Sequence, residues 1–194
     1  MRPPDYSRRV VVTGLGVISP VGNDKDTAWR NLVNGVSGIG EITRFDASAY
    51  EQRAAGEVKD FDPAAWLDPK AVRRSERSLQ FGVAAAKQAL ADAGFEITDA
   101  NRTEVGVVFG SGAGGQTLMI DNWITLREKG PGRVAPTFIA NGLVDSASGM
   151  IAIETGAIGF NICVVTACST GTACLGEAAE AIRRGDAVAI LAGS

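Results

Sequence analysis

The chain has 194 residues, 45% of them hydrophobic and 21% charged, and its formal net charge is −3. This length suits one domain or one half of a larger fold with a sizeable core, and the acidic balance with scattered Lys and Arg argues against nucleic-acid binding. The odd number of cysteines favours a reducing compartment over a disulfide framework, and the lack of an apolar run of signal or membrane-spanning length predicts a cytoplasmic protein without membrane contact.

The chain opens with an apolar run and a short helix. The sequence "RVVVT" at 9–13 predicts a buried strand, which the turn sequence "GLGVISPVG" ends. Asp24 or Asp26 is suited to cap a helix that runs through Asn34, because an Asp side chain accepts hydrogen bonds from the free N–H groups of a first helical turn. Gly35 then supplies the C-terminal stop.

The middle of the chain contains its most periodic segment. Residues 36–69 mix Gly, Pro and aromatic residues and predict an irregular excursion. From 75 to 93, apolar residues recur at spacings of three and four, which is the pattern of an amphipathic helix, and Gly94 ends it. The apolar run "VGVVF" at 105–109 predicts a second strand that leads into "GSGAGG".

The last part of the chain alternates helices and strands. We expect helices at 117–129, 139–155 and 169–184, and strands at 161–166 and 187–192. Strands that alternate with helices are typical of an α/β fold with a largely parallel, covered sheet. The last strand has no closing helix after it, so we expect the sequence to be the front part of a longer chain.

The glycine-rich turn satisfies the G-x-G-x-x-G pattern with Gly110, Gly112 and Gly115. A strand before it and a helix after it are the context of a dinucleotide-binding fingerprint. However, no second strand that ends in an acidic residue follows about twenty positions later, and Glu128 lies in the predicted helix. We therefore favour a turn that lines a cavity, and we keep a dinucleotide-binding domain that uses Gly110–Gly115 as the alternative.

The three cysteines lie close together in the sequence, at spacings that fit no metal site. Cys163 is expected inside the sheet and Cys174 on a buried helix face. Cys168 lies at the corner between a predicted strand and a helix, where unpaired N–H groups and the positive end of the helix dipole favour an anion. Its small neighbours leave room for a substrate, and its own amide can donate to an oxyanion. We interpret Cys168 as a nucleophile.

Several separated segments occur in an order that resembles one enzyme family. They are "RRVVVTGLGVISPVGN", "SGI", "ITRFDAS", "VGVVFGSGAGG", "VVTACSTG" and "AEAIRRGDAVAILAG". Together these motifs resemble the amino-terminal half of a β-ketoacyl-acyl-carrier-protein synthase, of the elongating class II type. The resemblance covers nearly the whole chain, from residue 8 to residue 194.

The resemblance implies a thiolase-like fold. In this fold two similar βαβαβαββ halves pack as a five-layered α-β-α-β-α sandwich, and residues 1–194 would be the N-terminal half. It also implies that Cys168 is the catalytic nucleophile and that its amide is one of two oxyanion donors. Ala113 and Phe138 take the positions of acyl-pocket residues. The resemblance also implies a homodimer that forms through the strand "NICVVT". It implies a site that needs no metal or cofactor.

The implied reaction is an acyl transfer followed by a decarboxylating Claisen condensation in fatty-acid elongation. The acyl group moves from the phosphopantetheine of acyl carrier protein to the cysteine. Malonyl-carrier protein then loses carbon dioxide and attacks that acyl group. The family uses two histidines and a lysine from its second half for this chemistry. The chain contains no histidine, so we expect the 194 residues alone to be inactive in condensation.

Some residues depart from the family pattern, and other functions compete. Asp145 stands where the family often has Asn, and Ala173 where it often has His. Ala113 is smaller than the isoleucine common in class II enzymes, so the pocket is expected to admit a longer or branched acyl chain. A polyketide ketosynthase, a thiolase and a non-catalytic chain-length-factor-like partner share the implied fold, and the presence of Cys168 argues against the last.

Overall fold

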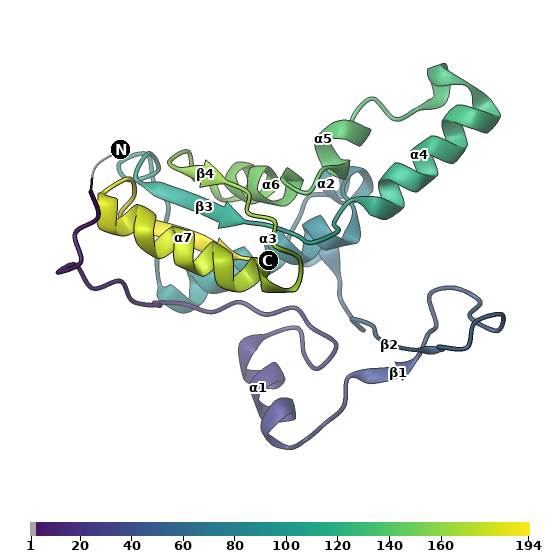
Figure 1. The fold of residues 1–194 in the computed structure, drawn as a ribbon, viewed down its shortest axis with the longest axis horizontal. Coiled ribbons are helices and arrows are strands. Elements are labelled where there is room, and N and C mark those ends of the chain that lie inside the picture. The colour runs from purple at the N-terminus through teal and green to yellow at the C-terminus, as the bar shows by residue number, and fades with distance from the viewer. Residues whose placement is uncertain (1–2) are drawn as a thin grey trace.

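The parallel sheet at the centre of the molecule has the strand order β4-β3-β5 (Figure 1). The computed structural model describes residues 3–194. β3 pairs in parallel with both neighbours, and Val107 lies opposite Asn161 on one side and Leu191 on the other. The predicted α/β class with a parallel sheet is therefore confirmed. The strands are β3 (Val105–Phe109), β4 (Asn161–Ile162) and β5 (Ala189–Gly193).

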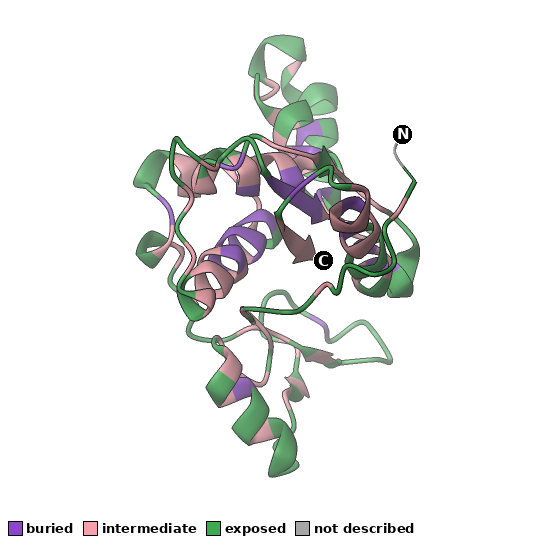
Figure 2. Cartoon of the chain, turned by 90° about the vertical axis from the view of Figure 1, so that its left-hand side faces the viewer, coloured by how far each residue is buried: buried purple, intermediate pink, exposed green. Residues whose placement is uncertain are grey.

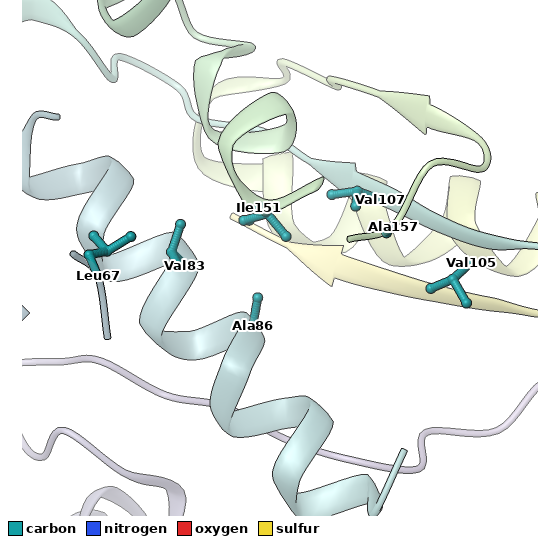
Figure 3. Close-up of a cluster of buried hydrophobic side chains, with 7 residues drawn as sticks. All are labelled: Leu67, Val83, Ala86, Val105, Val107, Ile151 and Ala157. Atoms are coloured by element: carbon teal, nitrogen blue, oxygen red, sulfur yellow. The ribbon is translucent and has the colours of Figure 1, made fainter. Parts of the chain in front are cut away.

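Helices cover both faces of the sheet, because successive side chains of β3 point to opposite faces. On one face, Val107 belongs to a cluster with Val83 and Ile151, whose side chains converge in Figure 3. On the other face, Val108 clusters with Cys174. All five side chains are at most 1% exposed, and burial of each of the four aliphatic ones contributes about 1.5–3 kcal/mol. The covering helices are α3 (Arg77–Ala93) and α6 (Ser146–Thr155) on the first face, and α7 (Thr170–Arg184) on the second.

The helix ends follow the capping residues that the sequence offers. Helix α1 spans Lys25–Val33, and the Asp24 carboxylate accepts a hydrogen bond from the Thr27 N–H at 2.8 Å. Helix α3 ends at Gly94, which adopts a left-handed conformation with φ of 58° and so can close the last turn without a side-chain clash. The predicted helices at both places are confirmed.

An arm and an N-terminal lobe extend away from this body (Figure 1). The arm consists of residues 116–142, and the N-terminal lobe of residues 25–56. Buried residues gather around the sheet, whereas the arm and the lobe are mostly half-buried or exposed (Figure 2). None of the helices within residues 3–194 combines the length and the apolar composition that a bilayer crossing requires. The remaining elements are β1 (Ile39–Glu41), β2 (Ala54–Gly56), η1 (Pro63–Ala65), α2 (Pro69–Arg74), α4 (Gln116–Lys129), η2 (Pro131–Arg133), α5 (Phe138–Gly142) and η3 (Ala167–Ser169).

The predicted buried strand at 9–13 is wrong. Its residues form no strand, and Val12 is 73% exposed. β3 is paired on both sides by β4 and β5, and residues 9–13 pair with neither of these outer strands. The chain instead continues along α3, where the Leu15 N–H donates to the Asp92 carboxylate at 3.0 Å.

Two further predictions of element length are wrong. The single helix expected at 139–155 is broken into α5 and α6, because the Ser146 hydroxyl accepts a hydrogen bond from the Leu143 N–H and closes a turn between them. The strand expected at 161–166 is paired only at 161–162. Beyond that point the chain leaves the sheet, and the Thr166 N–H donates to the side chain of Thr170.

Candidate active site

Cys168 lies at the predicted corner between the sheet and a helix. The short helix η3, Ala167–Ser169, turns the chain after β4, and α7 begins at the next residue. The Cys168 side chain in η3 is exposed, whereas that of Cys174 in α7 is fully buried. Burial raises the pKa of the Cys174 thiol, which suppresses the reactive thiolate there. The structure therefore presents Cys168, directly before α7, as the accessible thiol of this corner.

The backbone at this corner is strained. Ala167 has φ of +53°, a left-handed conformation that residues other than glycine adopt rarely and that concentrates at functional sites. The Thr166 carbonyl oxygen accepts hydrogen bonds from both the N–H and the hydroxyl of Ser169, at 3.2 and 2.8 Å. Within residues 3–194, the Cys168 N–H has no hydrogen-bond acceptor. It is therefore free to donate to an oxyanion that forms beside the thiol.

The first turn of α7 gives this corner a positive electrostatic character. Ser169 occupies the position that precedes the helix, and its side chain makes no capping hydrogen bond. N–H groups at the start of a helix lack partners within the helix, and the helix dipole places partial positive charge there. The free Cys168 N–H and the start of the helix therefore offer a site for the oxygen anion of a tetrahedral intermediate.

The glycine-rich turn packs directly against the corner. A Cβ atom on Gly110 would lie 1.8 Å from the Val164 carbonyl oxygen, and one on Gly115 would lie 1.9 Å from the Gly142 carbonyl oxygen. A Cβ on Gly112 would meet Ala167 at 3.4 Å. Gly110 and Gly115 are required because other parts of this protein approach them too closely for a side chain. This packing favours the interpretation of a structural turn over that of a dinucleotide cradle.

A cavity of about 350 Å³ adjoins this turn. Gly110 and Gly114 line it, together with residues of α3 and with Ser194 at the end of the chain. The prediction that the turn lines a cavity is confirmed. Ala113 is exposed in the turn, and Phe138 is half-buried at the start of α5; neither lines this cavity. Their roles in an acyl pocket stay predictions.

Cys163 lies at the margin of the core. It is half-buried, and its Sγ lies 3.5 Å from the Val144 carbonyl oxygen. Burial raises the pKa of the Cys163 thiol, and the nearby Asp145 carboxylate raises it further. Asp145 itself is exposed at the position before α6. Cys163 therefore lacks both the exposure and the electrostatic surroundings that a nucleophile needs.

One residue of the corner was not identified from the sequence. Thr170 is the first residue of α7 and only 2% exposed. Its hydroxyl accepts a hydrogen bond from the Thr166 N–H and donates one to the Ala167 carbonyl oxygen, at 3.0 and 2.8 Å. A threonine directly after a nucleophile turn is the only sequence signal for this arrangement, and it is not specific.

Residues 7–194 match the family model of the β-ketoacyl synthase N-terminal domain. The chain belongs to the β-ketoacyl synthase family. The family resemblance carried by the separated sequence motifs is thereby confirmed.

Bacterial relatives with similar sequences carry one common name, which describes an activity. The chain is 46% identical over 186 residues to a Coxiella burnetii protein named 3-oxoacyl-[acyl-carrier-protein] synthase 2, and 43% identical over 187 residues to a Staphylococcus aureus protein of the same name. Each alignment covers 96% of this chain and 45% of the relative. The chain thus spans about half the length of the curated relatives it matches.

Solved structures of ketosynthases have the same fold. An ishigamide ketosynthase/chain length factor superposes with a TM-score of 0.78 at 31% identity, covering 93% of this chain and 45% of that one. A β-ketoacyl synthase from Burkholderia phymatum superposes with a TM-score of 0.76 at 27% identity and the same coverage. The predicted thiolase-like fold is confirmed.

Proposed function

We propose that the protein is a 3-oxoacyl-[acyl-carrier-protein] synthase of fatty-acid elongation and that Cys168 is its acyl acceptor. The observation that carries this proposal is the corner itself. An exposed thiol precedes α7, its own N–H is free, and the glycine-rich turn packs against it. Relatives more than 40% identical are named for this activity, which supports the same chemistry here.

The first step transfers an acyl group to the protein. The Cys168 sulfur attacks the carbonyl carbon of an acyl thioester on the phosphopantetheine of acyl carrier protein. A new carbon–sulfur bond forms while the bond to the phosphopantetheine sulfur breaks, and the released thiolate takes up a proton. The Cys168 N–H stabilises the oxyanion of the tetrahedral intermediate.

The second step forms the carbon–carbon bond. Malonyl-carrier protein loses carbon dioxide, and the resulting carbanion attacks the acyl carbon on Cys168. The product is a 3-oxoacyl-carrier protein, and Cys168 leaves as a thiolate. The chain has no histidine, so any imidazole that assists decarboxylation comes from outside these 194 residues. The relatives that share the name are about twice as long.

We also propose a cytoplasmic homodimer in which two copies meet along β4. β4 is an edge strand of the sheet, so its outer edge carries unpaired backbone groups that a second strand can bind. Val165, which follows it, is 47% exposed. Light scattering of the complete gene product is expected to give a dimer mass. A Val165→Lys variant is expected to shift it toward the monomer, and an unchanged mass would contradict this interface.

The formation of 3-oxoacyl-carrier protein tests the proposed activity. In the complete gene product, Cys168→Ala is expected to lower the condensation rate at least about 100-fold, because no nucleophile remains to hold the acyl group. Cys163→Ala is the matched control and is expected to keep most of the activity. A Cys168→Ala variant that condenses at the wild-type rate would exclude Cys168 as the acyl acceptor.

Ala113 provides a test of acyl-chain preference. If Ala113 lines the acyl pocket, as the family resemblance implies, Ala113→Ile fills part of it and favours shorter acyl chains. The distribution of product lengths from a mixture of acyl-carrier proteins measures this effect. An unchanged distribution would remove Ala113 from the acyl pocket.

A polyketide ketosynthase is the second candidate, because one structural neighbour is a ketosynthase/chain length factor at 31% identity. The two functions differ in how many malonyl units are added before release. With an acyl primer and excess malonyl-carrier protein but no reductase, a fatty-acid enzyme is expected to add one two-carbon unit. Products with several successive units would favour the polyketide function.

A further inference from the structure

Thr170 is a polar residue in an unusually buried position. It is 2% exposed, and both hydrogen-bonding capacities of its hydroxyl are used on the nucleophile corner. The oxygen accepts from the Thr166 N–H at 3.0 Å, and the hydroxyl donates to the Ala167 carbonyl oxygen at 2.8 Å. These two backbone groups belong to consecutive residues directly before Cys168. One side chain therefore holds the backbone that leads into the nucleophile.

The methyl group of Thr170 is equally constrained. A Cβ atom on Gly110 would lie 2.8 Å from Thr170 Cγ2, so the methyl group packs against the first glycine of the glycine-rich turn. Thr170 thus connects three parts of the site: the turn, the corner and the first turn of α7. Valine has the same shape but no hydroxyl, so it would keep the packing and remove the hydrogen bonds.

The strained residue lies inside this hydrogen-bonded loop. Ala167 keeps a φ of +53°, and a residue other than glycine holds such a conformation only where its surroundings enforce it. A change of φ at Ala167 rotates the peptide unit that follows it, and this unit carries the Cys168 N–H. The direction of the oxyanion donor therefore depends on the conformation of Ala167.

We propose that Thr170 is a positioning residue for Cys168: its buried hydroxyl locks Ala167 in the left-handed conformation and thereby aims the Cys168 N–H at the acyl carbonyl. The proposal rests on the proposed function of Cys168 as acyl acceptor. Thr170 does not touch the reacting atoms and acts only through the backbone before the nucleophile.

Two reactions of the same thiol separate positioning from exposure. Acyl transfer passes through an oxyanion and needs a correctly aimed N–H donor. Alkylation by iodoacetamide displaces iodide at a saturated carbon and forms no oxyanion, so it reports only whether the thiolate is present and accessible. A residue that merely supports the fold would change both rates together.

The experiment compares both rates in the complete gene product, with octanoyl-carrier protein as the acyl donor. Thr170→Val is expected to lower the acylation rate of Cys168 by about 10- to 100-fold, a loss of the size seen when an oxyanion donor is misplaced. Its alkylation rate is expected to stay within about threefold of the wild-type rate. Thr170→Ser keeps the hydroxyl and is expected to restore acylation. Thr172→Val, the same substitution at an exposed position of the same helical turn, is expected to change neither rate.

The outcomes are distinguishable. Acylation of Thr170→Val at the wild-type rate would overturn the positioning role and leave the proposed function intact, whereas a wild-type Cys168 that is never acylated would overturn both. The buried Cys174 reports folding, because it reacts with iodoacetamide only when the core opens. If Thr170→Val exposes Cys174, the comparison is made instead between Thr170→Ala and Thr170→Ser, each checked for a protected Cys174. Equal acylation rates in that pair would overturn the proposal.

Discussion

Two short apolar runs of this chain have opposite environments. "VGVVF" at 105–109 forms β3, with strands on both edges and helices on both faces, and Val107 is 1% exposed. "RVVVT" at 9–13 has a similar composition but forms no strand, and Val12 is 73% exposed. The difference shows that apolar composition alone does not bury a segment. Burial of β3 depends on partners that arrive from residues 77–93, 146–162 and 170–193.

The largest expected effect of a single substitution is at the end of β3. Gly110→Ala would place a methyl group 1.8 Å from a backbone oxygen of the neighbouring segment. We expect the free energy of unfolding to fall by about 3 kcal/mol, at the upper end for overpacking, because backbone must move. Gly149→Ala is the matched control, since its methyl group would meet no atom within 4 Å. Urea unfolding measures both variants, and equal midpoints would contradict the packing of the turn against the corner.

The next effect tests the two apolar runs directly. Val107→Ala removes two methyl groups from the core and is expected to lower the free energy of unfolding by about 2 kcal/mol. Val12→Ala makes the same change at an exposed position and is expected to alter it by less than about 0.5 kcal/mol. If Val12→Ala costs as much as Val107→Ala in the complete gene product, residues 9–13 are buried after all.

The smallest effect concerns pH. Burial raises the pKa of Cys174, so the unfolded chain loses this thiol proton at a lower pH than the folded protein does. The stability that Cys174 contributes is therefore complete below the ordinary thiol pKa and is lost as the pH rises above it. Between about pH 7 and pH 9.5, wild-type protein is expected to lose more unfolding free energy than Cys174→Ala. Parallel pH profiles of the two proteins would show that Cys174 ionises equally in both states.

The sequence predicted the elements whose signals are local. β3 has the predicted bounds, and the helices that end at Gly94, Gly156 and Gly185 stop where glycine permits a left-handed residue. The failures have non-local causes. Residues 9–13 pair with no strand of the sheet, and the chain continues from them along α3. The break before α6 depends on the Ser146 side chain, which no periodic pattern reveals.

The candidate site was predicted in outline and not in detail. The position of Cys168 directly before a helix followed from the change of pattern at "VVTACST" and agrees with the structure, whereas the strand before it ends at Ile162. The left-handed conformation of Ala167 and the hydrogen bonds of the Thr170 hydroxyl could not be predicted. They depend on backbone geometry and on the approach of Gly110 from a distant part of the chain. Ala113 and Phe138 rest on the family resemblance alone.

Peptide mapping by mass spectrometry, after incubation of the complete gene product with octanoyl-carrier protein, tests the role of Cys168 most directly. The account predicts one octanoyl group on the peptide that contains Cys168, and none on Cys163 or Cys174. A folded protein whose Cys168 stays unmodified, or whose octanoyl group resides on another residue, would contradict it.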